Sequence, residues 1–188
     1  MSTIQLNSKD FASQTSSAEP VIASTVTGSP ALTLTNATFP SGHMIQHVYT
    51  TYNAIVSGST TINWDTTHML QTEGVEFMTQ AITPTNASNI LFINAHGHFG
   101  GSVATNGSML GLFQDSTSEA LAWFPYTHMN TNYHHPRAIS YYMVAGTTDP
   151  TTFKCRYGVA SGNAFFGDNN GTVEGKNFAN ISVSELVA

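Results

Sequence analysis

The chain has very little charge. Of its 188 residues, five are Lys or Arg and eleven are Asp or Glu, which gives a formal net charge of −6. The five cations form no basic run. Because a nucleic-acid backbone is held mainly by clustered Lys and Arg, this composition argues against nucleic-acid binding.

Long apolar segments are also missing. Nowhere do eighteen apolar residues follow one another, so the sequence predicts no membrane insertion. The first residues, Met1-Ser2-Thr3-Ile4, lack the cationic start and the apolar core of a signal peptide. We therefore expect a soluble protein that is made without export.

There is a single cysteine, which excludes an internal disulfide. Cys155 lies between Lys154 and Arg156 in a segment with strand character. Two interpretations remain open for it. It is either a small buried apolar residue or a reactive thiol favoured by its basic neighbours.

The sequence is rich in apolar residues and in uncharged polar ones. The apolar share is 40%, and Ser, Thr, Asn and Gly make up the surplus in short alternating runs such as residues 90–98. Thr, Val and aromatic residues fit strands, and Asn, Ser and Gly make turns. No run keeps the spacing of an amphipathic helix over a dozen residues. We expect strands over residues 43–57, 75–83, 89–98, 109–114, 120–124, 138–145, 151–159, 163–166 and 179–187.

This spacing predicts an all-β fold. The expected head, residues 41–188, is an antiparallel β-sandwich of jelly-roll type with eight to ten strands. Residues 1–40 differ, because Pro20, Pro30 and Pro40 interrupt any helix or central strand. We interpret them as an extended arm that adds strands to a partner. The arm residues expected to anchor it are the alternating apolar ones, Val21, Ile22, Val26, Leu32 and Leu34.

Several segments of the head resemble small structural proteins of tailed bacteriophages, marine ones in particular. Those proteins share a Pro-Ser-Gly-His-Val-Ile-Gln start, a Thr-Pro-Ser-x-x-Ser-Ser-Lys-Ile-Leu centre and a Thr-x-x-Glu-Ile end. The corresponding segments here are 39–46, 82–93 and 181–186, with further similarity at 112–117 and 151–157. This chain has Asn89 where the pattern has Lys, and the pattern does not require the histidines at 96 and 98.

The resemblance covers residues 36–188 and implies a setting without a reaction. It implies a TNF-like or related trimeric β-sandwich on a fibre, tail or capsid, exposed on the virion surface after synthesis in the host cytoplasm. The expected partners are two further copies of the chain, other virion proteins bound through the arm, and a host-surface glycan. A glycan-binding receptor-recognition tip of a tail fibre remains the alternative function.

Two groups of residues are candidate sites. His96 and His98 lie on one face of the strand expected at 89–98, and in a trimer three such pairs near the axis would suit a metal ion. We favour the alternative, in which both are ordinary strand-end histidines, and we expect no cofactor. The segment between Pro125 and Pro136 is expected to be a surface loop able to contact a glycan. The candidate binding residues in and beside it are Trp123, Tyr126, His128, Tyr133, His134 and His135.

Motifs of catalysis are missing. The sequence contains no Gly-x-Ser-x-Gly, His-Glu-x-x-His, Gly-x-Gly-x-x-Gly or phosphate-binding loop. A glycan hydrolase would need a carboxylate pair, and Asp65, Glu73 and Glu76 are the available candidates. We interpret them as solvated loop charges and do not expect an enzyme.

The arm generates a first prediction. Deleting residues 1–38 should leave the thermal transition of the head nearly unchanged, because the arm contributes few core residues. The same deletion should abolish incorporation into particles, because the arm makes the attachment. Calorimetry of the truncated protein and analysis of purified particles measure the two effects. A truncated chain that fails to fold, or one that still enters particles, contradicts the prediction.

Overall fold

The computed structural model describes the backbone of residues 2–6, 9–14, 21–22, 39–65, 67–104, 106–128, 134–167 and 179–188. Side chains are described from residue 39 onward within these ranges, except those of Asn106 and His128. Contacts divide the chain into two compact units, Met1–Thr38 and Phe39–Ala188. In the described part of the chain, no helix is long and apolar enough to cross a membrane.

The first unit contains a small antiparallel sheet in the order β1 (Ser2–Leu6), β2 (Lys9–Gln14), β3 (Val21–Ile22). In it Val21 pairs with Ser13 and Ile22 with Ala12. Two of the expected anchor residues therefore pair within their own unit, which the sequence did not predict. The other three, Val26, Leu32 and Leu34, lie outside the described residues.

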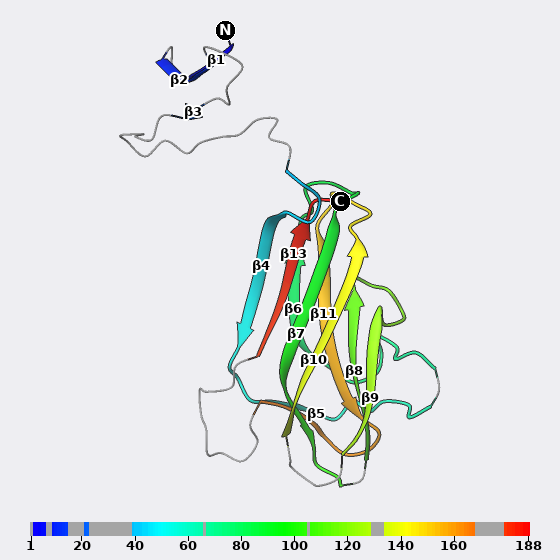
Figure 1. Cartoon of the computed structure of the whole chain (residues 1–188). Helices are drawn as coiled ribbons and strands as arrows, with labels where there is room; N and C mark the ends of the chain where they lie inside the picture. Colours follow the sequence, from blue (N-terminus) through cyan, green and yellow to red (C-terminus); the bar gives the residue numbers. More distant parts are fainter. Residues whose placement is uncertain are drawn as a thin grey trace. The chain divides into compact units, whose positions relative to one another are not determined.

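The second unit is a sandwich of two antiparallel sheets, which confirms the predicted fold class (Figure 1). The first sheet joins β4 (Met44–Tyr52), β13 (Ala179–Leu186), β7 (Ile90–Gly101) and β10 (His134–Val144), and the later part of β7 also pairs with β12 (Ala164–Phe166), which pairs with β5 (Val56–Gly58). The second sheet has the order β6 (Val75–Ile82), β11 (Thr151–Val159), β8 (Asn106–Gln114), β9 (Ala122–His128).

The core lies between the two sheets, where each strand sends every second side chain inward. From β7 these are Leu91, Ile93 and Ala95, all 0% exposed. Phe153 and Cys155 of β11 are equally buried in the same cluster. Aromatic rings fill the other end of this core: the ring of Phe99 lies 4.9 Å from that of Tyr157 and 5.4 Å from that of Phe166.

A second apolar cluster covers the outer side of the second sheet. It consists of Ile62, Met69, Met109, Phe113 and Ala120, with Trp123 and Ala160 packed against it. The segment between β5 and β6 supplies Ile62 and Met69, so this segment forms a lid over β8. The strand β8 is therefore covered on both sides.

A buried carboxylate joins three segments at the end of the sandwich where β4 begins and β13 ends. Glu185 on β13 is 0% exposed. Its Oε1 accepts hydrogen bonds from the Thr85 amide and hydroxyl, both at 2.8 Å, and from Asn89 Nδ2 at 2.7 Å. Its Oε2 accepts one from Gln46 Nε2 at 3.0 Å. We call this arrangement the Glu185 clamp.

The electrostatics of the clamp favour a charged carboxylate. Burial by itself raises the pKa of Glu185, but the hydrogen bonds from Asn89, Thr85 and Gln46 outweigh it and hold the pKa below its ordinary value. The charged form therefore belongs to the folded state.

The Glu185 clamp brings together three segments that lie far apart in the sequence, those of Gln46, Thr85 and Glu185. The Gly42 amide donates to the Val187 carbonyl at 2.8 Å, and the Val187 amide donates to the His43 carbonyl at 2.9 Å. Gly42 has a φ of +83°, which a glycine adopts without strain. These three segments therefore hold this end of the sandwich together.

The predicted strands all occur, with changes at their ends. The run expected at 43–57 is divided into β4 and β5, and β7 continues to Gly101. The largest correction concerns the expected surface loop, because β9 and β10 both extend into the segment between Pro125 and Pro136. Each of these strands lies at an edge of its sheet, where a proline without an N–H is tolerated.

The Glu185 clamp predicts a pH-dependent contribution to stability. Because the pKa is lowered on folding, the stabilisation is present above the unfolded carboxyl pKa and is lost as the pH falls through the folded pKa. Glu185→Gln should lower the free energy of unfolding at pH 7 by about 2–3 kcal/mol, because it removes charge-assisted hydrogen bonds from buried donors. Urea unfolding at pH 7 and at pH 3.5 measures the effect.

The control for this experiment is Glu76→Gln. Glu76 makes a partly exposed ion pair with Arg156 at 3.5 Å, and such a pair contributes at most about 1 kcal/mol. The difference between wild type and Glu185→Gln should shrink at pH 3.5. A difference that is the same at both pH values contradicts the role given to the charge.

Candidate functional site

The outward side of the first sheet differs from every other surface that the structure describes. Since Leu91, Ile93 and Ala95 of β7 point into the core, Phe92, Asn94, His96 and His98 point outward. Pairing extends this side over β13, β4 and β10. We call it the outer face, formed by His47, Tyr49 and Thr51 of β4, Asn180, Ser182, Ser184 and Leu186 of β13, Ile90, Phe92, Asn94, His96 and His98 of β7, and Pro136, Ala138, Ser140, Tyr142 and Val144 of β10.

Side chains of the outer face form rows across the strands. In one row Tyr142 lies opposite Phe92, and the two rings stack with centroids 4.3 Å apart. Ser184 and His47 continue this row, with 2.8 Å between His47 Nδ1 and Ser184 Oγ. These contacts hold the exposed side chains in a fixed arrangement, so the outer face has a defined shape.

A neighbouring row is made of hydroxyls, an amide and a phenol. Asn94 Nδ2 donates to Ser140 Oγ at 3.0 Å, and Ser182 and Tyr49 follow across β13 and β4. Tyr49 and Tyr142 are 63% and 60% exposed, and Val144 is 54% exposed. The outer face therefore exposes large apolar and aromatic groups among uncharged polar ones.

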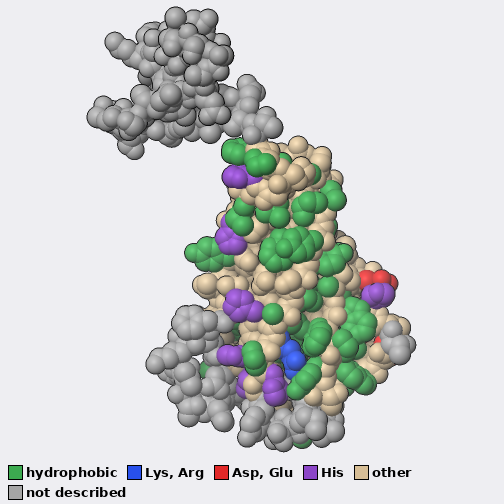
Figure 2. Space-filling view, viewed as in Figure 1, with side chains coloured by type: hydrophobic (Ala, Val, Ile, Leu, Met, Phe, Trp, Pro, Cys, Tyr) green, Lys and Arg blue, Asp and Glu red, His purple; other side chains and the backbone are tan. Residues whose placement is uncertain are grey.

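No charged side chain of the described residues belongs to this face. On the first sheet, Glu185 and Arg137 have the inward register. The other acidic residues of the head that the structure describes lie on the second sheet or in turns, at Asp65, Glu73, Glu76, Asp115, Glu119 and Asp149, and Asp168 and Glu174 lie outside the described residues. Figure 2 shows apolar and histidine side chains scattered over this side of the molecule, with acidic groups at one margin and a basic group in the lower middle of the view.

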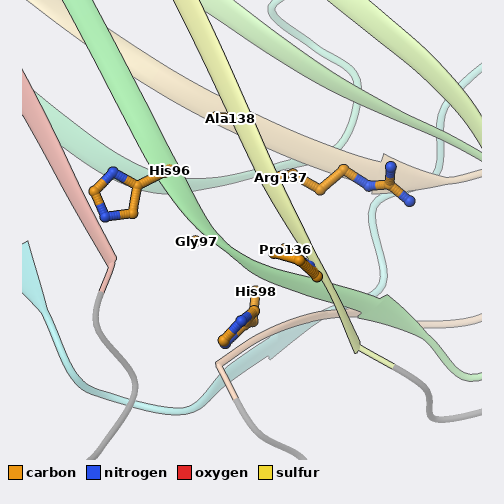
Figure 3. A pocket seen from close by; sticks show the side chains of 6 residues that line it. All are labelled: His96, Gly97, His98, Pro136, Arg137 and Ala138. Carbon is orange, nitrogen blue, oxygen red and sulfur yellow. The ribbon is translucent and has the colours of Figure 1, made fainter.

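His96 and His98 lie on this face, but not at the end of their strand. They line a shallow pocket of about 220 Å³ together with Gly97 of their own strand and Pro136, Arg137 and Ala138 of β10. Figure 3 shows the two rings on one side of the strands, whereas the Arg137 side chain points away from them. Gly97 between them packs inward, where an added Cβ would lie 2.9 Å from the Phe166 ring.

A metal site in one chain is not supported. Among the described residues, no three His, Cys, Asp or Glu side chains are close enough to hold a metal ion. His96 has Asn180 and Ala138 as its cross-strand neighbours, and His98 has Pro136. The histidine pair is therefore a feature of the outer face.

The residues expected to form a glycan-binding loop do not converge. Trp123 lies on β9 and faces the second apolar cluster, with its ring 6.3 Å from that of His68. Tyr126, three residues later, pairs with the buried Ser108 and has the inward register. His134 and His135 belong to β10, His128 ends β9, and Tyr133 lies outside the described residues.

A different group forms between the edge strands β9 and β10. The guanidinium of Arg137 stacks on the Tyr126 ring, with 3.4 Å between Cζ and the ring centroid. The His135 ring lies 5.5 Å from that of Tyr126. Arg137 Nε and Nη2 are buried and have no hydrogen-bond partner among the described residues. The sequence offered no signal for Arg137, because only the pairing of two distant strands places it over Tyr126.

Asp65, Glu73 and Glu76, the carboxylates considered for a glycan hydrolase, each bind other groups of the fold. Glu73 accepts hydrogen bonds from the amides of Asn63 and Leu70, both at 2.7 Å. Asp65 accepts hydrogen bonds from the Thr67 hydroxyl and amide, which lower its pKa. Glu76 pairs with Arg156.

Cys155 is a core residue. Its side chain is 0% exposed, and burial raises the pKa of the thiol to about 12. Since the thiolate is the reactive form, the thiol is inert at neutral pH. The first of its two interpretations is therefore the one that the structure supports.

No protein-family model matches the chain, and no curated protein matches it in sequence. Among solved structures, dimeric latent PorU from Porphyromonas gingivalis is 12% identical with a TM-score of 0.39, over 81% of this chain and 14% of that one. The VP2 subviral particle of infectious bursal disease virus is 14% identical with a TM-score of 0.34, over 84% of this chain and 46% of that one.

A third similarity is to the enzymatically active domain of tailspike protein 4 from bacteriophage CBA120. It is 13% identical with a TM-score of 0.26, over 64% of this chain and 18% of that one. The chain thus has distant similarity to a viral capsid protein and to a phage tailspike, and it spans less than half the length of each solved chain. At these scores the likeness does not bear on what this chain binds.

Proposed function

We propose that the chain is a structural protein of a tailed-bacteriophage virion, in which three copies of the head associate through the outer face and the N-terminal arm anchors the assembly to capsid or tail. The head is then a fibre knob or decoration protein that is exposed to the host surface. The observation that carries the proposal is the outer face, which is rich in exposed aromatic and hydroxyl groups and has no charge.

The contrast between the two sheets supports this role. The outer side of the second sheet is covered by the lid that contains Ile62 and Met69. The outer face of the first sheet has no such cover among the described residues, although its four strands span an area on the order of 500 Å². An exposed patch of that size with apolar groups is typical of an interaction surface.

A second copy of the same chain fits this surface better than a charged partner does. The whole chain has a net charge of −6, so two copies repel each other wherever their acidic surfaces meet. The outer face is where this repulsion is weakest, because the acidic residues of the head lie on the second sheet and in turns. Tyr49, Phe92 and Tyr142 supply the large, partly rigid contact area that such interfaces use.

Association has a direct test. Native mass spectrometry of the head at micromolar concentration should show a trimer. Tyr142→Glu should abolish it, because a carboxylate buried in an apolar interface has no partner on the outer face. Leu70→Glu is the matched control, since Leu70 is an exposed apolar residue on the lid of the other sheet. A monomeric wild type, or a trimer that survives Tyr142→Glu, contradicts the proposal.

A specific observation also favours contact with a host saccharide, although at a different place from the expected loop. Nε and Nη2 of Arg137, two donors on one edge of the guanidinium, are buried without a hydrogen-bond partner among the described residues, and the two oxygens of a carboxylate that reaches them would satisfy both. The Tyr126 ring beneath supplies an apolar face of the kind that packs on a sugar ring. The suitable ligand class is an acidic saccharide that carries a uronic acid.

This second function is tested with oligogalacturonate as the probe and a neutral galactose oligomer for comparison. Calorimetric titration should show binding of the acidic oligomer only, and Arg137→Met should weaken it by about tenfold or more, as expected for a lost charged hydrogen bond. Arg156→Met is the control, because Arg156 is used by Glu76 and by the Glu73 and Gly74 carbonyls. Equal binding by wild type and Arg137→Met rejects this site.

A further inference from the structure

The histidines of the outer face lie where a second copy would cover them. His47 belongs to β4, and His96 and His98 line the pocket of about 220 Å³ beside Pro136 and Ala138. His96 is half-buried and His98 is exposed in the single chain. A pocket of this size takes up one or two side chains of a neighbour, so contact between copies would remove these imidazoles from water.

Among the described residues, the surroundings of the histidines contain no acidic side chain, and the cation Arg137 also lines their pocket. Across the strands, His96 faces Ala138 and Asn180, His98 faces Pro136, and His47 faces Ser184. Along β7 the neighbours on the same side are Asn94 and Gly100. Other titratable groups on this side, among the described residues, are the imidazole of His134, opposite Gly100, and the phenols of Tyr49 and Tyr142. Asp168 follows Gly167, whose amide donates to the His98 carbonyl, but Asp168 lies outside the described residues.

From this arrangement we infer that association through the outer face is controlled by protons: copies associate while His96 and His98 are neutral and separate when they become charged. The inference rests on the proposed function and adds a regulation to it. Imidazole takes up its proton within the range from pH 8 to pH 5. In the separate head the imidazolium is hydrated. In the covered pocket it has no acidic partner among the described residues, so protonation favours separation.

A metal ion is not needed for this behaviour. Neutral imidazoles pack against Pro136 and Ala138 as flat, largely apolar rings, which suits a contact made of aromatic and hydroxyl groups. The same rings become cations at lower pH. The outer face therefore changes from an uncharged surface to a positively charged one, and two or three copies then repel each other at the place where they were in contact.

The experiment follows the mass of the full chain by light scattering at pH 7.5 and at pH 5.5. Wild type should be trimeric at pH 7.5, and its dissociation constant should rise at least about tenfold at pH 5.5. The double variant His96→Gln, His98→Gln stays neutral at both pH values and should lose most of this change. His68→Gln is the matched control, because His68 contacts Trp123 on the other sheet and its loss should leave the pH dependence intact.

The possible results distinguish a failure of the proposed function from a failure of the proton-controlled association. A wild type that is monomeric at pH 7.5 rejects the proposed function and with it this inference. A trimer that is equally stable at both pH values rejects the inference alone, as does a double variant that dissociates in acid like wild type. If the double variant does not assemble at pH 7.5, the single variant His98→Gln decides, because it should show an intermediate pH dependence.

Discussion

The Glu185 clamp is the interaction on which the rest of the head depends. A carboxylate without exposed surface is stable only when donors surround it, and here those donors come from β4 and from the turn that leads into β7. The clamp sets the register of β13 between its two neighbours. Since β13 and β7 form the centre of the first sheet, the positions of Phe92, His96 and Ser184 on the outer face follow from it.

The two sheets of the sandwich have different partners. The second sheet packs against the core on one side, and the lid covers β8 on the other, so β8 is apolar in both registers, whereas β11 carries Lys154 and Arg156 on its outer side. The first sheet alternates between buried aliphatic residues and an outer row of hydroxyl, amide, imidazole and aromatic groups. The polar groups of such a surface hydrogen-bond to water, so it is compatible with solvent although it lacks charged side chains. Burying it in a contact also moves no charged group out of water. This combination is what association between copies requires.

Arg137 and the histidine pair lie on opposite sides of β7 and β10 (Figure 3). The two groups would therefore serve different purposes. The histidines belong to the surface proposed to meet another copy, while Arg137 lies over Tyr126 at the open edge between the two sheets. One head thus combines an assembly surface and a candidate contact for an external ligand without overlap between their side chains.

Much of the architecture was visible in the sequence. Alternation of period two along residues 90–98 and 151–159 follows from the geometry of a strand, so it predicted both strands and placed His96 and His98 on one face. Prolines misled the prediction at 125 and 136, because a local rule cannot tell an edge strand from a central one. The buried state of Cys155 was one of two open interpretations, and its basic neighbours point to the other side of β11.

The sequence itself therefore determined which segments form strands, because this depends on neighbouring residues. It also determined the low content of charged residues, which is a matter of composition. Only the tertiary structure decided which strands pair, and pairing depends on contacts between residues far apart in the chain. Glu185 meets Thr85 from 100 positions away, and Arg137 reaches Tyr126 across the gap between two sheets. No local pattern records such distances, so the outer face and its missing charge became visible only when four separate strands were placed side by side.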